Sequence, residues 1–329
     1  MQRAGNGVHL PCLTPGVHPE KRSLRPDVTN NSMLSIQTEE NSALSARTKV
    51  PEMEQRTFSR RAFLSGTTLL LSGGAGPIPG ASASPVVRFG LFTDVHYADK
   101  PELRTRYYRE SLTKLREGVT TLRKSRVDFL LCLGDLVDAT TELELERTWV
   151  AETVNVIQTL TKRQFLSEVG QERSHYSFTR SGVHFVILDA CYRKDGLSYD
   201  AGNFDWKDTE IPPAEREWLK KDLAGASGPA VVFVHQRLDS DDVHAVASAP
   251  EVRQILEDSG NVSAVFQGHS HQNDYRDING IHYCTMRAVI EGSGAANNGY
   301  AEIAIFNDGG VKVEGFRAQR SYRIQPAAV

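Results

Sequence analysis

The sequence predicts a single α/β domain in which β-sheets pack face to face, and three observations lead to this prediction. From residue 86 onward, short runs rich in Val, Ile and Phe alternate with amphipathic helical patterns. After residue 280 the helical patterns stop, and three strand-like runs follow one another. Four of the apolar runs end in Asp or His residues, at the edge where α/β sheets place their sites.

Length, composition and charge are ordinary for a soluble globular protein of one large domain or two small ones. The chain has 329 residues, of which 40% are hydrophobic and 24% charged, with a formal net charge of -3. This balance argues against a large electrostatic surface for nucleic acid, and we expect no nucleic-acid partner. The four cysteines contain no Cys-x-x-Cys spacing, so neither a disulfide framework nor a zinc knuckle is predicted.

No folded domain is predicted for the first 83 residues. Residues 1–52 are polar and without periodicity, and we interpret them as disordered or not translated. Met53 opens a short basic region containing Arg60 and Arg61, followed by an apolar, Gly-rich stretch and by Ala-Ser-Ala at 81–83. Residues 53–83 are therefore similar to a twin-arginine export signal with a small-residue cleavage site.

An N-terminal amphipathic or anchoring helix is the alternative for the same residues. The apolar part, near residues 67–71, is too short to span a bilayer and is interrupted by Gly and Pro. We therefore expect an exported protein, periplasmic or extracytoplasmic, that begins near Ser84 and has no stable membrane span after signal removal. Its transport partner would be the twin-arginine export machinery.

The first half of the domain alternates strands and helices. Strands are predicted at 86–92, 127–133 and 183–188, and helices at 104–124 and 141–160. The second half has one predicted helix at 213–223. Its predicted strands lie at 230–234, 262–266, 281–285, 300–306 and 311–316.

Asp94 and His96 directly follow the first strand. Strand side chains alternate between faces, so residues two apart are expected to converge just past the carboxyl end of the strand. A carboxylate oxygen and an imidazole nitrogen suit a divalent metal such as manganese, iron or zinc. Taken alone, Asp-x-His is also compatible with an ordinary turn.

Three later strands end in the same residue types. Asp135 follows the second strand, His235 follows the strand at 230–234, and His269 and His271 follow the strand at 262–266. Each has a structural alternative: a turn cap for Gly-Asp, a core histidine, or solvated turn residues. Because all of them fall at strand ends, the set together favours a metal site.

The ordered motifs resemble those of the calcineurin-like metallophosphoesterase superfamily over nearly all of residues 86–316. The motifs are Asp94-x-His96, Gly134-Asp135-x-x-Asp138, His235 and Gly268-His269-x-His271. Tyr-Ala-Asp at 97–99 and Arg-Tyr-Tyr-Arg at 106–109 are similar to the manganese-dependent ADP-ribose/CDP-alcohol diphosphatase group. The resemblance implies a four-layer sandwich of two mixed β-sheets flanked by helices, in one domain at 84–329.

The resemblance also implies a role for each residue. Two divalent metal ions (manganese, iron or zinc) would be held by Asp94, His96 and His271 at the first site and by His235 and His269 at the second, with Asp135 bridging both. The implied reaction is hydrolysis of a phosphoester or diphosphate bond in a small phosphorylated substrate by a hydroxide that bridges the metals. Asp135 and Asp138 are the predicted catalytic residues, and Asp138 would orient a ligand or the bridging water.

One superfamily motif, Gly-Asn-His-Asp/Glu, is absent from the sequence. In the family its Asn binds the second metal, and its His contacts the phosphate and can protonate the leaving group. The predicted helix 141–160 runs directly into 161–166 instead, which indicates a deletion near that junction that removes one strand. We expect a weaker second metal site and impaired activity, least so for leaving groups that depart readily as anions.

Two alternatives to an enzyme follow from this departure. The chain could be a non-catalytic protein of the same fold that binds metal or a phosphorylated ligand, or a metal-stabilised structural domain.

Asn203, in the loop 202–206, is a candidate substrate contact. Asn155, His175 and His184 are interpreted as structural, and His244 has no motif context.

Overall fold

The computed structural model describes residues 84–138, 145, 148–149, 173–199 and 203–325, with the backbone of 63–65 and 68–72. The chain divides into units at 1–57 and 58–329, and all described residues lie in the second unit. The helix expected at 141–160 and its junction with 161–166 lie mostly outside the described residues, although 145, 148 and 149 are helical.

The first sheet has seven strands in the order β1-β2-β4-β3-β11-β12-β13. Only β3 and β4 run parallel, and the other neighbours are antiparallel. The strands are β1 (Phe63–Ser65), β2 (Thr68–Ser72), β3 (Val87–Phe92), β4 (Phe129–Cys132), β11 (Gly299–Ile305), β12 (Val311–Arg317) and β13 (Tyr322–Ile324).

The second sheet has six strands in the order β5-β6-β7-β8-β10-β9. The four inner strands are parallel, and an antiparallel strand closes each edge. The strands are β5 (Tyr176–Arg180), β6 (Val183–Ile187), β7 (Ala230–Phe233), β8 (Val262–Gln267), β9 (Asp274–Ile278) and β10 (Ile281–Thr285).

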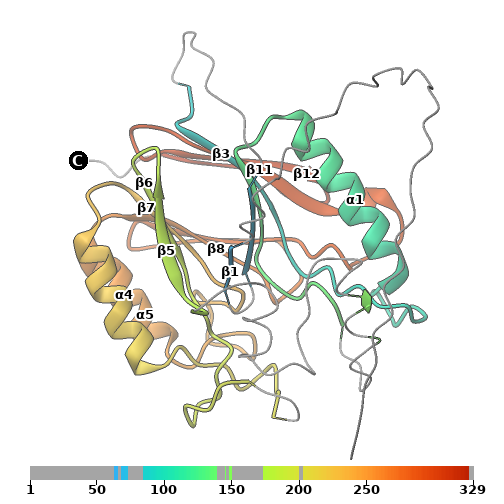
Figure 1. Cartoon of the computed structure of the whole chain (residues 1–329), viewed down its shortest axis with the longest axis horizontal. Helices are drawn as coiled ribbons and strands as arrows, with labels where there is room; N and C mark the ends of the chain where they lie inside the picture. Colours follow the sequence, from blue (N-terminus) through green and yellow to red (C-terminus); the bar gives the residue numbers. More distant parts are fainter. Residues whose placement is uncertain are drawn as a thin grey trace, which may run out of the picture. The chain divides into compact units, whose positions relative to one another are not determined.

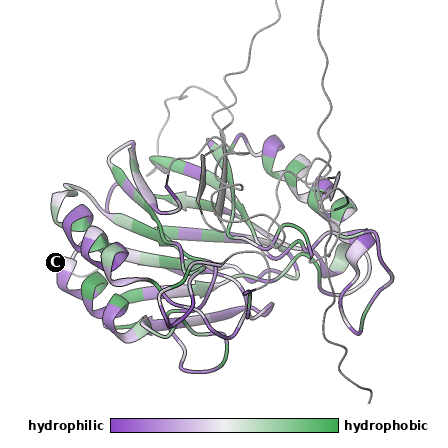
Figure 2. Cartoon of the chain, turned by 60° about the horizontal axis from the view of Figure 1, so that its bottom comes forward, coloured by the Kyte–Doolittle hydropathy of each residue, from purple (hydrophilic) through white to green (hydrophobic). Residues whose placement is uncertain are grey.

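Helices cover the outer faces of the two sheets, as Figure 1 shows. Helix α1 (Tyr108–Lys124) packs on the first sheet, and α4 (Pro213–Gly225) and α5 (Ala249–Ser259) pack together on the second. A short 3-10 helix, η1, spans Ala295–Asn297. In Figure 2 hydrophobic and hydrophilic residues alternate along these helices, as expected for helices with one face on a sheet. The predicted architecture of two mixed sheets flanked by helices is confirmed.

Strands β4 and β7, which lead to the site, are apolar throughout because both of their faces are buried. In β3, Phe89 and Leu91 enter the core between the sheets, whereas Phe92 faces α1. Aromatic rings fill the middle of this core, where Phe89 stacks on Phe129 at 5.0 Å and meets Phe233 edge-on at 5.6 Å. Alternate residues of β3 therefore pack against different layers, which fixes the register of this strand.

Two local predictions need correction. Helix α1 begins at Tyr108 instead of residue 104, because Leu103 and Arg106 exchange backbone hydrogen bonds of 3.0 Å across a tight turn. Helix α5 and strand β9 were not predicted. The periodicity in α5 is short, with Val252 and Leu256 buried one turn apart.

The residues that the sequence analysis assigns to an export signal include β2. This strand pairs antiparallel with β4, on the side away from β3. The assignment to an export signal stays a prediction, as does the assignment of residues 1–52. Among the described residues, no helix combines the length and hydrophobicity needed to cross a membrane.

Candidate metal centre

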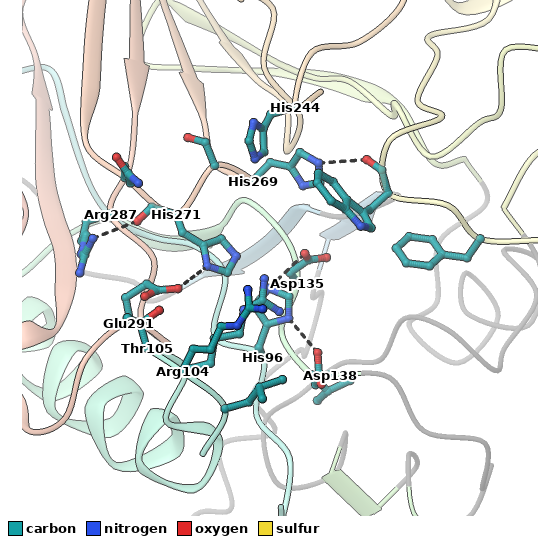
Figure 3. A pocket seen from close by; sticks show the side chains of 17 residues that line it. His96, Arg104, Thr105, Asp135, Asp138, His244, His269, His271, Arg287 and Glu291 are labelled. Carbon is teal, nitrogen blue, oxygen red and sulfur yellow. Dashed lines mark hydrogen bonds and ion pairs between the residues drawn. The ribbon is translucent and has the colours of Figure 1, made fainter. Parts of the chain in front are cut away.

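The carboxyl ends of four parallel strands open at one edge of the sandwich and bring the six predicted metal ligands together. Strands β3 and β4 belong to the first sheet, and β7 and β8 to the second. The ligand atoms form two groups, each within 4.8 Å: the first cluster, Asp94, His96 and His271, and the second cluster, Asp135, His235 and His269. Figure 3 shows His96, Asp135, His269 and His271 facing one cavity.

The first cluster is centred on one oxygen of Asp94. Asp94 Oδ1 lies 3.3 Å from His271 Nε2 and 3.8 Å from His96 Nε2. Its other oxygen, Oδ2, accepts hydrogen bonds from Thr93 Oγ1 at 2.7 Å and from the backbone N–H of His269 at 3.2 Å. The carboxylate is thereby held with Oδ1 directed at the two imidazoles.

The second cluster shares its carboxylate with the first. Asp135 Oδ2 lies 3.2 Å from His235 Nε2 and also 3.3 Å from His96 Nε2 of the first cluster. His235 Nε2 in turn lies 3.2 Å from His269 Nδ1. Asp135 therefore stands between the clusters, in the position expected of a residue that bridges two ions.

The residues converge by a different route from the one that the sequence analysis assumed. Strand β3 ends at Phe92, so the pleat does not place Asp94 and His96 on one side. Both residues have positive φ, 50° and 44°, and the backbone turns sharply at each. Asp135, His269 and His271 also have positive φ, between 51° and 67°. Such backbone conformations are uncommon for non-glycine residues and gather at functional sites.

Gly268 makes the approach of β8 to Asp94 possible. A Cβ atom at this position would lie 2.4 Å from Thr93 Oγ1 and 2.7 Å from Asp94 Oδ2. Both are closer than a real Cβ contact allows, so a side chain here would push the carboxylate away. The glycine in Gly268-His269-x-His271 therefore serves the packing of the clusters.

Two carboxylates outside the clusters orient the imidazoles of the first cluster. His271 Nδ1 donates a 2.8 Å hydrogen bond to Glu291 Oε1, which leaves Nε2 facing Asp94. Asp138 Oδ1 lies 3.3 Å from His96 Nδ1, and Lys100 forms an ion pair with its other oxygen. Partners of this kind fix the tautomer and ring orientation of metal-binding histidines.

The carboxylates of the clusters are strongly stabilised in their ionised form. Burial by itself would raise the pKa of Asp94, but His235 and His271 outweigh burial and hold its pKa well below its ordinary value. The pKa of Asp135 is lowered in the same way, by His235 and His96 against burial. Both side chains are therefore anionic at neutral pH, the form that binds a cation.

The histidines of the two clusters differ in proton affinity. Burial lowers the pKa of His96, but Asp135, Asp138 and Asp94 outweigh burial and raise it to about 10. In the second cluster, burial and the neighbouring His235 lower the pKa of His269 to about 4. His269 is therefore neutral at pH 7, whereas a divalent ion at the first cluster would have to displace a proton from His96.

The donor atoms suit a pair of hard or borderline divalent cations. Asp94 Oδ1 and both ring nitrogens of His96 are buried, and their polar neighbours, at 3.3–3.8 Å, do not have the geometry of hydrogen bonds. A buried carboxylate oxygen without a partner is costly unless a cation is bound there. The set contains oxygen and nitrogen but no thiolate, which favours manganese, iron or zinc over softer metals.

Four of the six cluster residues, His96, Asp135, His269 and His271, line a cavity of about 780 Å³. Arginines contribute to its lining (Arg104, Arg106 and Arg287), and so do aromatic residues and an imidazole (Phe204, Trp206 and His244). The second cluster adjoins the aromatic part, since the carbonyl oxygen of Trp206 lies 3.1 Å from His269 Nε2. The cavity therefore combines positive charge and aromatic surface around the clusters.

Several lining residues were missed or misplaced by the sequence analysis. In the loop 202–206, Phe204 and Trp206 line the cavity, whereas Asn203 Nδ2 donates a hydrogen bond to the carbonyl oxygen of Ser198. His244 lines the cavity with Asp242 on its Nδ1 at 3.1 Å. The Asp-x-His spacing, already informative at the first strand, could have identified it.

The histidines interpreted as structural pair with carboxylates outside the cavity lining. His184 Nε2 lies 2.7 Å from Asp222, and His175 Nδ1 lies 3.1 Å from the buried Glu215. Burial, opposed in part by His175, raises the pKa of Glu215 to about 7. Asn155 and the region of the missing motif lie outside the described residues.

The fold that carries the paired clusters is similar to that of a solved dimetal phosphatase. A solved dimetal phosphatase from Danio rerio matches 74% of this chain and 100% of its own with a TM-score of 0.64, at 19% sequence identity. Two curated relatives make the comparison more specific. A manganese-dependent ADP-ribose/CDP-alcohol diphosphatase from Oryza sativa subsp. japonica is 23% identical over 281 residues, covering 66% of this chain and 87% of the relative.

A diphosphatase of the same name from Danio rerio is 47% identical over 60 residues, 16% of this chain and 19% of the relative. No family model matches the chain. These findings confirm the resemblance to metal-dependent phosphoesterases that the motifs predict.

The alignment with the Oryza relative also bears on the missing motif. Two thirds of a 329-residue chain (66%, or about 217 residues) is fewer than the 281 aligned positions. The relative therefore has aligned positions at which this chain has no residue. This agrees with a shortened chain, as the absent Gly-Asn-His motif indicates.

Proposed function

We propose that this protein is a hydrolase of phosphoester or diphosphate bonds that depends on two divalent metal ions, with manganese as the physiological ion. The observation that carries the proposal is the pair of Asp/His clusters joined through Asp135 Oδ2, at one cavity. The two curated relatives are named manganese-dependent ADP-ribose/CDP-alcohol diphosphatases, which supports manganese as the ion and a small diphosphate as the substrate.

Each side chain has a defined task in this proposal. Asp94, His96 and His271 would hold one ion, His235 and His269 the other, and Asp135 both. When bound, paired divalent ions activate a water and stabilise the charge of an in-line displacement at phosphorus. Glu291 and Asp138 hold His271 and His96 in orientation.

The lack of the Gly-Asn-His motif limits the chemistry that we propose. The second cluster has three protein ligands among the described residues. A missing general acid costs typically 10²–10⁴-fold in rate, and it matters most for poor leaving groups. We therefore expect aryl diesters and nucleotide diphosphates to be better substrates than alkyl monoesters. Metal binding without turnover is the alternative that this departure favours.

The test is turnover with defined metal content. The purified protein is loaded with manganese and assayed on ADP-ribose, bis(p-nitrophenyl) phosphate and an alkyl monoester, while bound metal is measured by atomic emission. We expect close to two ions per chain, hydrolysis of the first two substrates, and loss of activity after chelation. One ion per chain without turnover would instead support the binding protein, and equal aryl and alkyl rates would contradict the leaving-group argument.

We also propose export through the twin-arginine route, which the motif at Arg60 and Arg61 supports. Residues 53–83 fused to a reporter should direct it out of the cytoplasm, and Lys in place of both arginines should retain it there. Export that is unaffected by the double substitution would contradict the proposal.

A further inference from the structure

Arg104 lies at the tip of a two-residue hairpin at the cavity. Leu103 N–H donates to the carbonyl oxygen of Arg106 and Arg106 N–H donates to that of Leu103, both at 3.0 Å. Arg104 and Thr105 form the loop between them, and Arg104 lines the same cavity as the clusters. Figure 3 shows its side chain extending toward the side where His96 and Asp135 lie.

The backbone of Arg104 is in a conformation that disfavours any residue but glycine. Its φ is +54°, whereas Thr105 is not among the positive-φ residues. A positive φ at the first loop position alone is the pattern of a type II′ turn, where glycine is usual. A strained non-glycine residue persists where its surroundings hold it in place, often at a binding site. The chain therefore keeps a charged side chain at a position that glycine would occupy without strain.

The hairpin is tied to the segment 289–292, which carries Glu291. Gly292 N–H donates to the carbonyl oxygen of Thr105 at 2.8 Å, and Tyr107 N–H donates to that of Ile290 at 3.1 Å. From α1, Lys114 Nζ donates to the carbonyl oxygens of Val289, Glu291 and Gly292.

The same segment is anchored to the metal ligands. Ile290 N–H donates to the carbonyl oxygen of Asp94 at 3.0 Å, and the Glu291 carboxylate accepts from His271. The backbone at Arg104 is therefore fixed relative to the first cluster through hydrogen bonds of known length. A side chain carried on such a support can be placed reproducibly next to the reacting groups.

The guanidinium of Arg104 is available for a ligand. The residue is exposed, and within the described part of the chain its side chain has no hydrogen-bond or ion-pair partner. By contrast, Arg287 Nη1 donates to the carbonyl oxygen of His271 at 3.3 Å. A planar guanidinium at a cavity mouth is well suited to bidentate binding of a phosphate.

We propose that Arg104 binds the second phosphate of a diphosphate substrate, on the leaving-group side of the bond that breaks. Bound metal ions would neutralise the phosphoryl group that is attacked, so that group needs no additional cation. A second phosphate carries its own charge and requires a separate partner. Arg104 is then the residue that favours diphosphates over substrates with a single phosphate, an assignment that rests on the proposed function.

The experiment compares Arg104→Gly with a matched control, Arg126→Gly. Arg126 is also an exposed arginine with positive φ, +56°, but it follows α1 and is not part of the cavity lining. Glycine relieves the backbone strain at both sites, so neither variant should unfold the protein. Any difference between them then reports the loss of the guanidinium in the cavity.

For Arg104→Gly we expect kcat/KM for ADP-ribose to fall by roughly 10–100-fold, the effect of losing one charge-assisted hydrogen-bond pair. The value for bis(p-nitrophenyl) phosphate should stay within about two-fold, because that substrate has one phosphate. Arg126→Gly should change neither. Equal losses on the two substrates, or no loss on ADP-ribose, would overturn the proposal.

A binding measurement gives a readout that is independent of turnover. Calorimetry with methylene diphosphonate and methylphosphonate on the manganese-loaded protein should show weaker binding of the diphosphonate alone in Arg104→Gly, at unchanged metal content. If the variant loses metal, the residue supports the cluster and the proposal fails. If the unmodified protein hydrolyses neither substrate but still prefers the diphosphonate through Arg104, the proposed function fails and the anion site stands.

Discussion

The two clusters have the same composition, one aspartate and two histidines, but they are supported in different ways. In the first cluster a carboxylate stands behind each imidazole: Glu291 behind His271 and Asp138 behind His96. In the second, His235 Nδ1 is buried without a hydrogen-bond partner among the described residues, and His269 Nε2 faces only the carbonyl oxygen of Trp206. Ionised carboxylates therefore orient the imidazoles of the first cluster, whereas packing and the loop that contains Trp206 orient those of the second.

This difference indicates that the two ions are bound with different strength. Carboxylates that hydrogen-bond to metal-binding imidazoles typically contribute about 10–100-fold to metal affinity. The second cluster has neither such carboxylates in the described residues nor the asparagine of the absent motif. We expect stepwise loading, with the first cluster filled before the second. The predictions below test this comparison, beginning with the residue that both clusters share.

Asp135→Asn should have the largest effect, because the substitution removes the charge that joins the clusters. We expect turnover to fall by at least roughly 10²–10³-fold, the cost of losing one preorganised electrostatic group at a reacting centre. The measurement is kcat with manganese, alongside bound metal per chain. Circular dichroism should be unchanged, and a variant that keeps near-normal activity with two ions would show that Asp135 does not bridge.

Glu291→Gln should weaken only the first cluster. The amide oxygen still accepts from His271 Nδ1, but the negative charge behind the imidazole is lost. Manganese affinity at the tighter site should decrease by about 10-fold, the lower end for outer-shell partners. Competition with a fluorescent chelator measures this affinity, and an equal loss at both sites would contradict the separate roles assigned to the clusters.

The smallest expected effect concerns stability against pH in the metal-free protein. The pKa of His96, about 10, is above the unfolded value of about 6.5, so its contribution is complete below pH 6.5 and is lost as pH rises through 10. The pKa of His269, about 4, is below the unfolded value, so its contribution is lost as pH falls from 6.5 through 4. The two histidines therefore lose their contributions to stability at opposite ends of the pH range.

Urea denaturation with and without chelator, between pH 5 and pH 10, measures how the free energy of unfolding changes with pH at the acid and alkaline ends. Metal loading should remove the alkaline loss, since a metal-bound His96 carries no proton. His96→Gln should remove it in the metal-free protein as well. If the stability of the metal-free variant still falls at alkaline pH, a group other than His96 is responsible.

The sequence indicated which Asp and His residues the structure brings together, because their signal is local. Each follows an apolar strand, and the carboxyl ends of parallel strands must meet at one edge of a sheet, so Asp94, Asp135, His235 and His269 could be placed together without coordinates. Glu291 and Arg104 have no such signal. Their positions depend on hydrogen bonds to segments distant in sequence, from Gly292 to Thr105 and from His271 to Glu291.

The backbone conformation of the cluster residues also could not be predicted from the sequence. Alternation along a strand suggested that Asp94 and His96 share a face, and the residues do converge, but through positive φ angles beyond the strand. Side-chain type indicated which residues form the clusters, and the positive φ angles determine how these residues reach the site. Helix α5 was overlooked because its buried stripe covers only three turns.

Strand β2, which precedes Ser84, pairs with β4, and β4 leads into Asp135 of the candidate metal centre. Removal of the residues before Ser84 would uncover the backbone N–H and C=O groups on that side of β4. An open strand edge is a template for pairing with other copies of the chain. The protein without those residues should then self-associate at elevated concentration. Light scattering of the two forms would measure how strongly the residues before Ser84 protect this edge of the sheet.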